Sequence, residues 1–209
     1  MKKLESSLLN MVLVLTGVAV IMGSILAWVN SITTNPIAEQ QKKALADGIK
    51  AVMQADEITV SKIDTLNETN AKGKEQIFII YNNEKGAAVE STTDGFGGKL
   101  RVLVGFNPEG KILGYTILEH AETPGLGAKA DKWFQKGEKG CIIDKQPTKD
   151  DLLTVTKKAP ETQYEVQAIT ASTITSRAFI LAVNNAYNAY MKAPATDAQT
   201  SATKQHKEE

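Results

Sequence analysis

A long run of uncharged, mainly apolar residues near the N-terminus constrains the fold of this chain more than any other sequence feature. The run extends from Leu8 to Val29, 22 residues without one charged side chain. As an α-helix it would be about 33 Å long at ~1.5 Å per residue, close to the thickness of the hydrocarbon core of a bilayer. The run therefore predicts one membrane-spanning helix, followed by a domain outside the bilayer.

A cleavable secretory signal is the alternative interpretation, because Lys2 and Lys3 precede the run like the basic region of a signal. The run is longer than a typical signal core, however, and no clear A-x-A cleavage site follows it. The same two lysines favour a cytoplasmic N-terminus, although Lys42 and Lys43 lie within range on the other side. We expect an uncleaved anchor with the domain on the extracytoplasmic side.

Charge and composition exclude several classes of function. Lys and Arg number 24, Asp and Glu also number 24, and there is no basic block, so the electrostatic attraction that nucleic-acid binding needs is missing. One cysteine, Cys141, and two histidines leave no C-x-x-C motif and no His/Cys metal cluster. No P-loop or strand followed by G-x-G-x-x-G is present. His120 could act as the base of a Ser/His/Asp triad, but no nucleophile elbow accompanies it.

The chain is expected to consist of an anchor (residues 1–30), one domain (residues 31–192) and a tail (residues 193–209). The middle segment has the usual length of a single domain with its own core. The tail is mostly Ala, Thr, Gln, Lys and Glu, with no large apolar side chain to bury, and is therefore expected to be disordered.

Residue periodicity predicts that the domain is α+β, with a mainly antiparallel sheet and packed helices. Strands are expected at residues 76–81, 86–92, 101–106 and 112–118, and two brief ones at 150–155 and 164–169. The turn Asn107-Pro108-Glu109-Gly110 favours a hairpin between two of them. Residues 64–73 are polar and are predicted to be a loop. Helices are expected at residues 37–55, 130–136 and 174–191, and the last has apolar residues at a spacing that suits packing on the sheet.

Three short stretches could carry chemistry, although each also has an ordinary structural explanation. Gly95-Phe96-Gly97-Gly98-Lys99 would let the backbone pass close to a ligand, or be a plain β-turn. Glu122 to Lys129 reads Glu-Thr-Pro-Gly-Leu-Gly-Ala-Lys, a carboxylate and a hydroxyl beside a Pro-Gly turn, as in many loops. Thr170 to Ser176 reads Thr-Ala-Ser-Thr-Ile-Thr-Ser and opens the last helix. It could be a simple N-cap or a phosphate site, because helix N-termini bind phosphate.

These stretches, in this order behind one anchor, resemble the FMN-binding domain family, most closely the G subunit of the Rnf electron-transport complex, over roughly residues 96–190. In that family a Glu-Thr-Pro-Gly-Leu-Gly segment precedes the motif Ser/Thr-Gly-Ala-Thr/Ser-x-Ser/Thr. The fourth residue of the motif receives FMN through a phosphoester bond. On this sequence Thr170 takes the first position, Thr173 the fourth and Thr175 the last. The resemblance implies a covalent FMN on Thr173.

The sequence departs from the family motif at two positions. Ala171 stands in place of Gly, and it would be strained if the site requires a positive φ. Ser172 stands in place of Ala and adds a second hydroxyl next to Thr173. Ser172 is therefore an alternative acceptor.

The resemblance also implies which residues bind the flavin. Besides Thr173, they are Thr170, Ser172, Thr175, Glu122, Thr123, Gly125, Leu126 and Gly127. The isoalloxazine ring would lie near Glu122, Thr123 and Leu126. Arg177 and Lys129 could contact the phosphate and the reduced ring, but ordinary surface positions explain them equally well or better. No catalytic residue is expected, because in that family a separate FMN transferase attaches the flavin. No metal ligand is expected, because the sequence has no His/Cys cluster.

The function that the resemblance implies is electron transfer as one subunit of a membrane complex. An Rnf-type complex couples electron transfer between reduced ferredoxin and NAD to the pumping of sodium ions or protons. The chain would be a single-pass protein of the bacterial inner membrane, with its flavin domain on the periplasmic side. It would relay electrons between partner subunits and perform no complete reaction alone.

Two other functions fit parts of the sequence. The C subunit of a sodium-translocating NADH:quinone reductase has the same flavin domain and anchor, but usually a longer chain. An anchored binding or assembly protein without a redox group would use the stretch from Thr170 to Ser176 only to cap a helix.

Overall fold

The computed structural model of the protein describes residues 8–54, 60–69 and 75–192. These residues form two units, of which the first ends at Ala44 and the second begins at Leu45. The tail at residues 193–209, for which the sequence predicts disorder, lies outside the described residues.

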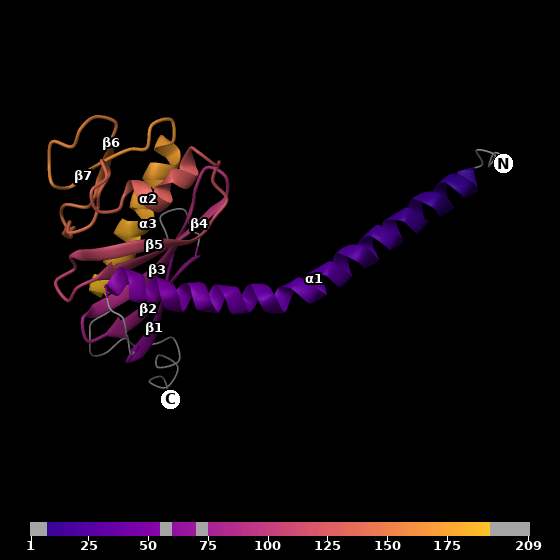
Figure 1. The fold of residues 1–209 in the computed structure, drawn as a ribbon, viewed down its shortest axis with the longest axis horizontal. Helices are drawn as coiled ribbons and strands as arrows, with labels where there is room; N and C mark the ends of the chain where they lie inside the picture. The colour runs from indigo at the N-terminus through magenta and orange to yellow at the C-terminus, as the bar shows by residue number, and fades with distance from the viewer. Residues whose placement is uncertain (1–7, 55–59, 70–74, 193–209) are drawn as a thin grey trace. The chain divides into compact units, whose positions relative to one another are not determined.

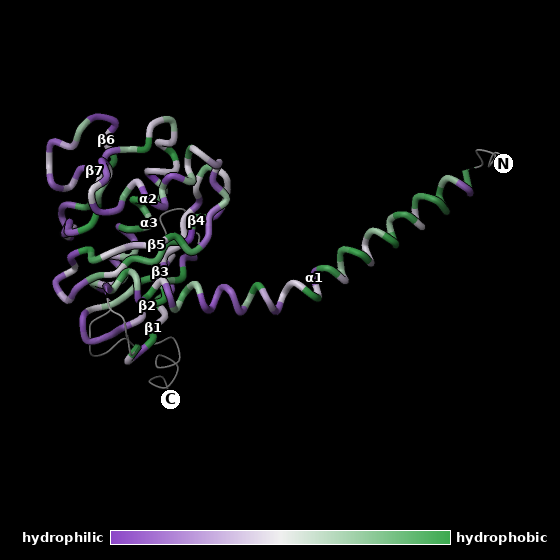
Figure 2. Tube along the Cα trace, viewed as in Figure 1, coloured by the Kyte–Doolittle hydropathy of each residue, from purple (hydrophilic) through white to green (hydrophobic). Residues whose placement is uncertain are grey.

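Helix α1 (Leu8–Met53) joins the apolar run and the helix expected at residues 37–55 into one continuous helix, with Ala55 outside the described residues. Its large apolar side chains from Leu8 to Ile37 are exposed. Figure 2 shows that the first part of α1 is hydrophobic and that the part closer to its C-terminal end is mainly hydrophilic. Within the described chain, α1 is the one helix long and apolar enough to cross a membrane. An apolar surface on all sides suits contact with lipid.

The second unit is built on a five-stranded antiparallel sheet with the order β1-β2-β3-β4-β5 (Figure 1). The strands are β1 (Lys62–Thr69), β2 (Glu75–Asn83), β3 (Gly86–Asp94), β4 (Lys99–Phe106) and β5 (Ile112–His120). Each strand pairs with the next one in the chain, as short connections require. In the last hairpin, Asn107 Oδ1 accepts hydrogen bonds from the Glu109 and Lys111 amides at 3.1 and 2.8 Å. The mainly antiparallel sheet and the α+β class are confirmed.

The prediction of a loop at residues 64–73 is wrong as far as Thr69, because this stretch forms most of β1. Residues 70–73 lie outside the described chain. In β1 only Asp64 is buried, where its carboxylate accepts a hydrogen bond from Asn82 Nδ2 at 2.9 Å and pairs with Lys62 at 3.0 Å. An edge strand is held by backbone pairing on one side and needs no apolar run. Its polarity therefore did not distinguish it from a loop.

Helix α3 (Thr173–Lys192) covers one face of the sheet and confirms the helix predicted at residues 174–191 (Figure 1). The core beneath it contains a stack of Phe134 on Phe179, with ring centroids 4.3 Å apart. The opposite face of the sheet packs against the last turns of α1, where Ile49, Val52 and Met53 are buried.

A buried tyrosine connects the sheet to the short helix that follows it. Tyr115 of β5 donates a hydrogen bond to the Ala130 carbonyl at 2.7 Å and accepts one from the Phe134 amide at 3.2 Å. Burial raises the pKa of Tyr115 far above its ordinary value, so the hydroxyl keeps its proton and remains a donor. This pair of bonds fixes the segment that leads from β5 to the short helix α2.

The remaining elements are shorter than the sequence predicts. A 3-10 turn, η1 (Gly127–Lys129), leads into α2 (Ala130–Trp133), which ends before the expected Lys136. Strands β6 (Thr154–Thr156) and β7 (Glu165–Gln167) overlap the two brief predicted strands and form a separate parallel pair.

Candidate functional site

The three stretches singled out in the sequence meet at one cavity of about 370 Å³. They come from the β3–β4 turn, from the segment between β5 and η1, and from the beginning of α3. The lining residues are Phe96, Glu122, Thr123, Leu126, Gly127, Ala171, Ser172, Thr173, Ile174 and Thr175. The structure thus brings together residues that are up to about 80 positions apart in the chain.

The carboxylate of Glu122 joins all three stretches. It is buried, with 6% of the residue exposed. Its Oε1 accepts hydrogen bonds from the backbone amides of Phe96 at 2.7 Å and Gly97 at 3.4 Å. Its Oε2 accepts one from the Thr175 hydroxyl at 2.7 Å. Glu122 therefore holds the β3–β4 turn against the start of α3.

Glycines surround this carboxylate because nothing larger fits. A Cβ at Gly95 would lie 2.1 Å from Glu122 Oε1, and a Cβ at Gly127 would lie 2.4 Å from Oε2. A Cβ at Gly127 would also meet the Thr175 hydroxyl at 2.8 Å. The glycines of two separate stretches are thus explained by one buried side chain.

The beginning of α3 is held by a network of its own. The Ser172 amide donates to the Ile169 carbonyl at 3.0 Å, and the Ser176 amide donates to the Ser172 carbonyl at 3.0 Å. The Ser176 hydroxyl accepts from the Ile169 amide and donates to the Ser172 carbonyl, both at 2.9 Å. The turn before the helix is therefore fixed by side-chain as well as backbone bonds.

Three backbone amides in the first turn of α3 have no hydrogen-bond partner among the described residues. Within the described part of the chain, the N–H groups of Thr173, Ile174 and Thr175 make no hydrogen bond, and neither does the half-exposed Thr173 hydroxyl. Free amides at a helix N-terminus, together with the positive end of the helix dipole, attract phosphate. The wall of the cavity formed by α3 therefore suits a phosphate group, and it carries the Thr173 hydroxyl.

Ala171, one of the two departures from the family motif, has a backbone φ of +63°. It is the third residue of the turn from Ile169 to Ser172, where a type II turn requires a positive φ and glycine fits best. The strain expected for alanine at a positive φ therefore applies here, because a side chain in the left-handed region costs about 1–2 kcal/mol relative to glycine.

Replacing Ala171 by glycine is expected to raise the free energy of unfolding by roughly 0.5–1 kcal/mol. Relief of the strain outweighs the added freedom of glycine in the unfolded chain, which costs about 0.4–1 kcal/mol. Urea unfolding of the full chain in mild detergent would measure the difference. The control is Ala121→Gly at an exposed position without a positive φ, where stability should fall. A loss of stability in both variants would contradict the strain at Ala171.

Not every predicted residue lines this cavity. Thr170 is exposed and outside its lining, and Arg177 is exposed without an ion pair within the described chain. Gly125 has a φ of +75° in the turn that the Leu126 amide closes on the Thr123 carbonyl at 3.2 Å. It lines a neighbouring cavity instead.

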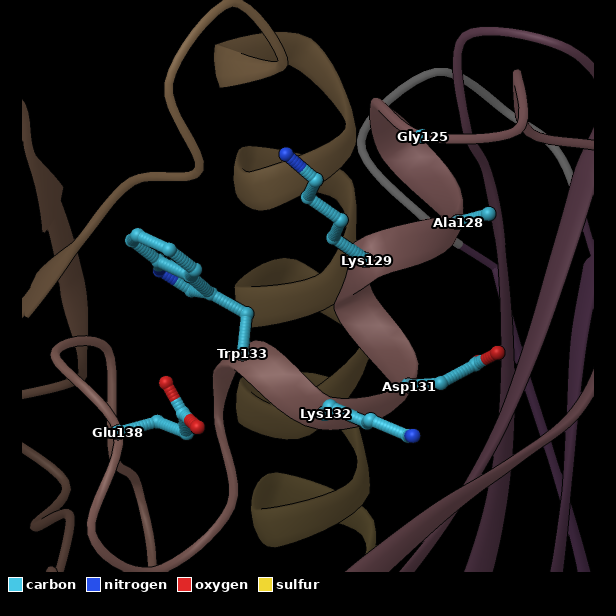
Figure 3. A pocket seen from close by; sticks show the side chains of 7 residues that line it. All are labelled: Gly125, Ala128, Lys129, Asp131, Lys132, Trp133 and Glu138. Atoms are coloured by element: carbon cyan, nitrogen blue, oxygen red, sulfur yellow. The ribbon is translucent and has the colours of Figure 1, made fainter.

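That neighbouring cavity, of about 330 Å³, lies along η1 and α2 (Figure 3). Figure 3 shows Lys129 and Trp133 on one side of this segment and Asp131 on the other. The Trp133 indole nitrogen donates to the Gln167 carbonyl at 2.9 Å, so the ring is held in place. Lys129 is exposed, as expected for a surface lysine.

Sequence reasoning did not include Phe96 and Ile174 among the site residues. Both line the cavity and are largely exposed, at 67% and 58%. The signal that could have identified them is a large apolar residue between glycines for Phe96, and one directly after Thr173 at the start of a helix for Ile174.

Comparison with known families gives two matches along the chain. A sequence model of the FMN-binding domain matches residues 95–188 and contains the whole cavity. A second model, described as the RnfG N-terminal region, matches residues 1–52. Together they cover the apolar helix and the site, but leave β1, β2 and β3 unmatched.

Curated relatives share most of the chain. The G subunit of a proton-translocating ferredoxin:NAD(+) oxidoreductase complex from Clostridium ljungdahlii is 35% identical, over 82% of this chain and 85% of that protein. The G subunit of a Na(+)-translocating ferredoxin:NAD(+) oxidoreductase complex from Acetobacterium woodii is 34% identical, over 77% and 75%. The G subunit of an ion-translocating oxidoreductase complex from Escherichia coli is 30% identical, over 77% and 80%.

Among solved structures, the crystal structure of the C subunit of the Na(+)-translocating NADH-quinone reductase from Parabacteroides distasonis is similar, with 17% identity and a TM-score of 0.48. The similarity covers 77% of this chain and 96% of that one.

Proposed function

Because this chain belongs to the family of the G subunits of ion-translocating oxidoreductase complexes, we propose that it carries one FMN on Thr173 and passes electrons through it. The linkage is a phosphoester between the Thr173 hydroxyl oxygen and the FMN phosphate. The observation that carries this proposal is the position of Thr173. Its half-exposed, unpartnered hydroxyl lies in the cavity at a helix N-terminus with three amides that are free within the described chain.

The first turn of α3 suits the phosphate of an attached flavin. The free amides of Thr173, Ile174 and Thr175 can donate to phosphate oxygens, and the helix dipole favours the negative charge. Ser172 and Thr175 are buried, with 8% and 2% of each residue exposed, and the Thr175 hydroxyl already donates to Glu122. Thr173 is therefore the most available of the three hydroxyls.

The apolar side chains of the cavity suit the flat ring of the flavin. Phe96, Leu126 and Ile174 come from three different segments and expose 67%, 42% and 58% of their surface around one cavity. Flavin supplies reversible electron transfer when bound, and the surrounding protein sets its potential. Burial of these side chains against the ring would hold it beside the polar groups of the Glu122 to Gly127 segment.

Attachment requires a separate FMN transferase. Among the described residues, no carboxylate or imidazole hydrogen-bonds to the Thr173 hydroxyl, so the described part of the chain offers no base to activate it. Thr173 is then the substrate of another enzyme.

The apolar part of α1 would anchor the chain as a single-pass protein in the bacterial inner membrane. The lysines before Leu8 favour a cytoplasmic N-terminus and a flavin domain on the periplasmic side. The chain would work with other subunits of a ferredoxin:NAD oxidoreductase complex, because two of its relatives are subunits of such complexes. Partner subunits would supply the ferredoxin and NAD sites and the ion path.

The test is the intact mass of the full chain produced with and without a flavin transferase. With the transferase, the mass should increase by one FMN less one water, and yellow colour should stay with the denatured chain. Without it, the chain should have its bare mass. A colourless, unmodified chain despite an active transferase would contradict the proposal.

A further inference from the structure

Glu122 is a buried acid without a cationic partner among the described residues. Its carboxylate takes part in no salt bridge there, and the groups that bind it are two backbone amides and one hydroxyl. An ionised carboxylate only accepts hydrogen bonds, and three donors suit that state. A negative charge therefore lies in the wall of the cavity, and no ion pair within the described chain neutralises it.

This charge lies in the same cavity as Thr173. Glu122 and Thr173 both line the cavity, and Glu122 binds the hydroxyl of Thr175, two residues beyond Thr173. With 6% of the residue exposed, the charge is far less screened by water and salt than a surface carboxylate. It acts on whatever occupies the cavity.

We infer that Glu122 is a positioning and tuning residue that lowers the midpoint potential of the flavin by its charge. This inference rests on the proposed attachment of FMN to Thr173. Reduction adds negative charge to the flavin unless a proton accompanies each electron, and a fixed negative charge nearby disfavours that addition. The same carboxylate positions the β3–β4 turn, but the effect on the potential follows from its charge and not from the turn.

Two substitutions separate the charge from the geometry. Glu122→Gln keeps the length and removes the charge, since its amide oxygen can accept from Phe96 and Gly97 while the Thr175 hydroxyl rotates to accept from its amide nitrogen. Glu122→Asp keeps the charge but is too short to preserve all three bonds. A purely structural role would be disturbed more by aspartate, whereas an electrostatic role is disturbed only by glutamine.

The experiment is a redox titration of the flavin in the full-length protein after coexpression with the transferase, with intact mass as the measure of loading. Glu122→Gln should shift the equilibrium toward the reduced flavin at least tenfold. For a two-electron couple, this corresponds to an increase in the midpoint potential of about 30 mV. Glu122→Asp should stay close to the wild type. The charge control is Glu109→Gln, an exposed residue in the β4–β5 turn at the other end of these strands, which should leave the potential unchanged.

A loaded Glu122→Gln variant with the wild-type potential would overturn the inference and leave the proposed function intact. An equal increase in Glu109→Gln would overturn it as well. If Glu122→Gln takes up no flavin, the potential of the wild-type protein is the test. It should lie below the potential of free FMN in the same buffer, and a value at or above that of free FMN refutes the role of the charge. A wild type that carries no flavin would instead refute the proposed function.

Discussion

No flavin is expected on a Thr173→Val variant, whose intact mass should equal that of the bare chain even after coexpression with the transferase. Valine keeps the branched shape of threonine but has no oxygen that could form a phosphoester. Thr173 is only half buried and its hydroxyl has no partner in the described chain, so the fold should be retained within about 0.5 kcal/mol. Mass spectrometry of the denatured protein measures the loss directly.

Ser172→Ala and Thr175→Val are the matched controls for this loss, because each removes one neighbouring hydroxyl from the same turn. Both should still gain one FMN, although Thr175→Val also removes the hydrogen bond to Glu122 and should be loaded more slowly. A mass gain that persists in Thr173→Val would contradict attachment at Thr173 and point to Ser172 or Thr175. The mass gain should then be lost in Ser172→Ala if Ser172 is the acceptor, and in Thr175→Val if Thr175 is.

Local patterns in the sequence predicted most elements of the domain. The turn from Asn107 to Gly110 lies between two runs with alternating apolar residues, and these runs became β4 and β5. Strand β1 was not predicted, because it is a polar edge strand in which Asp64 is the one buried residue. Its pairing with β2 is a long-range property that local composition does not contain.

The candidate site could be located from the sequence, but its connections could not. The order of the three stretches predicted that Glu122 and Thr173 belong to one site, and both residues line the same cavity. The hydrogen bonds that connect the three stretches run to Glu122 from Phe96, 26 residues away, and from Thr175, 53 residues away, and no local rule predicts them. The role of the Glu122 carboxylate in connecting the three stretches therefore follows only from the folded structure.

Backbone strain is an intermediate case. The sequence showed that Ala171 would be unfavourable if its position needed a positive φ, and the structure gives that φ as +63°. The conformation itself follows from the turn that joins Ile169 to Ser172 and from the bonds of Ser176, which tie the turn to α3. The contacts around the turn thus fix its backbone conformation, and the residue type at position 171 determines how much free energy that conformation costs.

Gly97→Ala is expected to be the most damaging glycine substitution at the site, lowering the free energy of unfolding by about 2–4 kcal/mol. A Cβ at Gly97 would lie 1.9 Å from the Ala121 carbonyl oxygen, so backbone would collide with backbone and no side chain could move aside. The turn would have to withdraw from the end of β5 and give up the hydrogen bonds from Phe96 and Gly97 to Glu122. Flavin loading should fall together with stability.

Gly125→Ala separates this collision from ordinary backbone strain. Gly125 has a φ of +75°, but a Cβ added there would have nothing within 4 Å, whereas Gly97 has no positive φ and needs to be glycine only because of the close approach. Alanine at Gly125 should therefore cost about 1 kcal/mol, the penalty of a left-handed backbone alone. Urea unfolding of both variants in the same detergent gives the comparison, provided that the slope of the unfolding free energy against urea concentration is the same for both. Equal costs would mean that the β3–β4 turn can move away from Ala121 freely, and that the Glu122 bonds do not hold it in place.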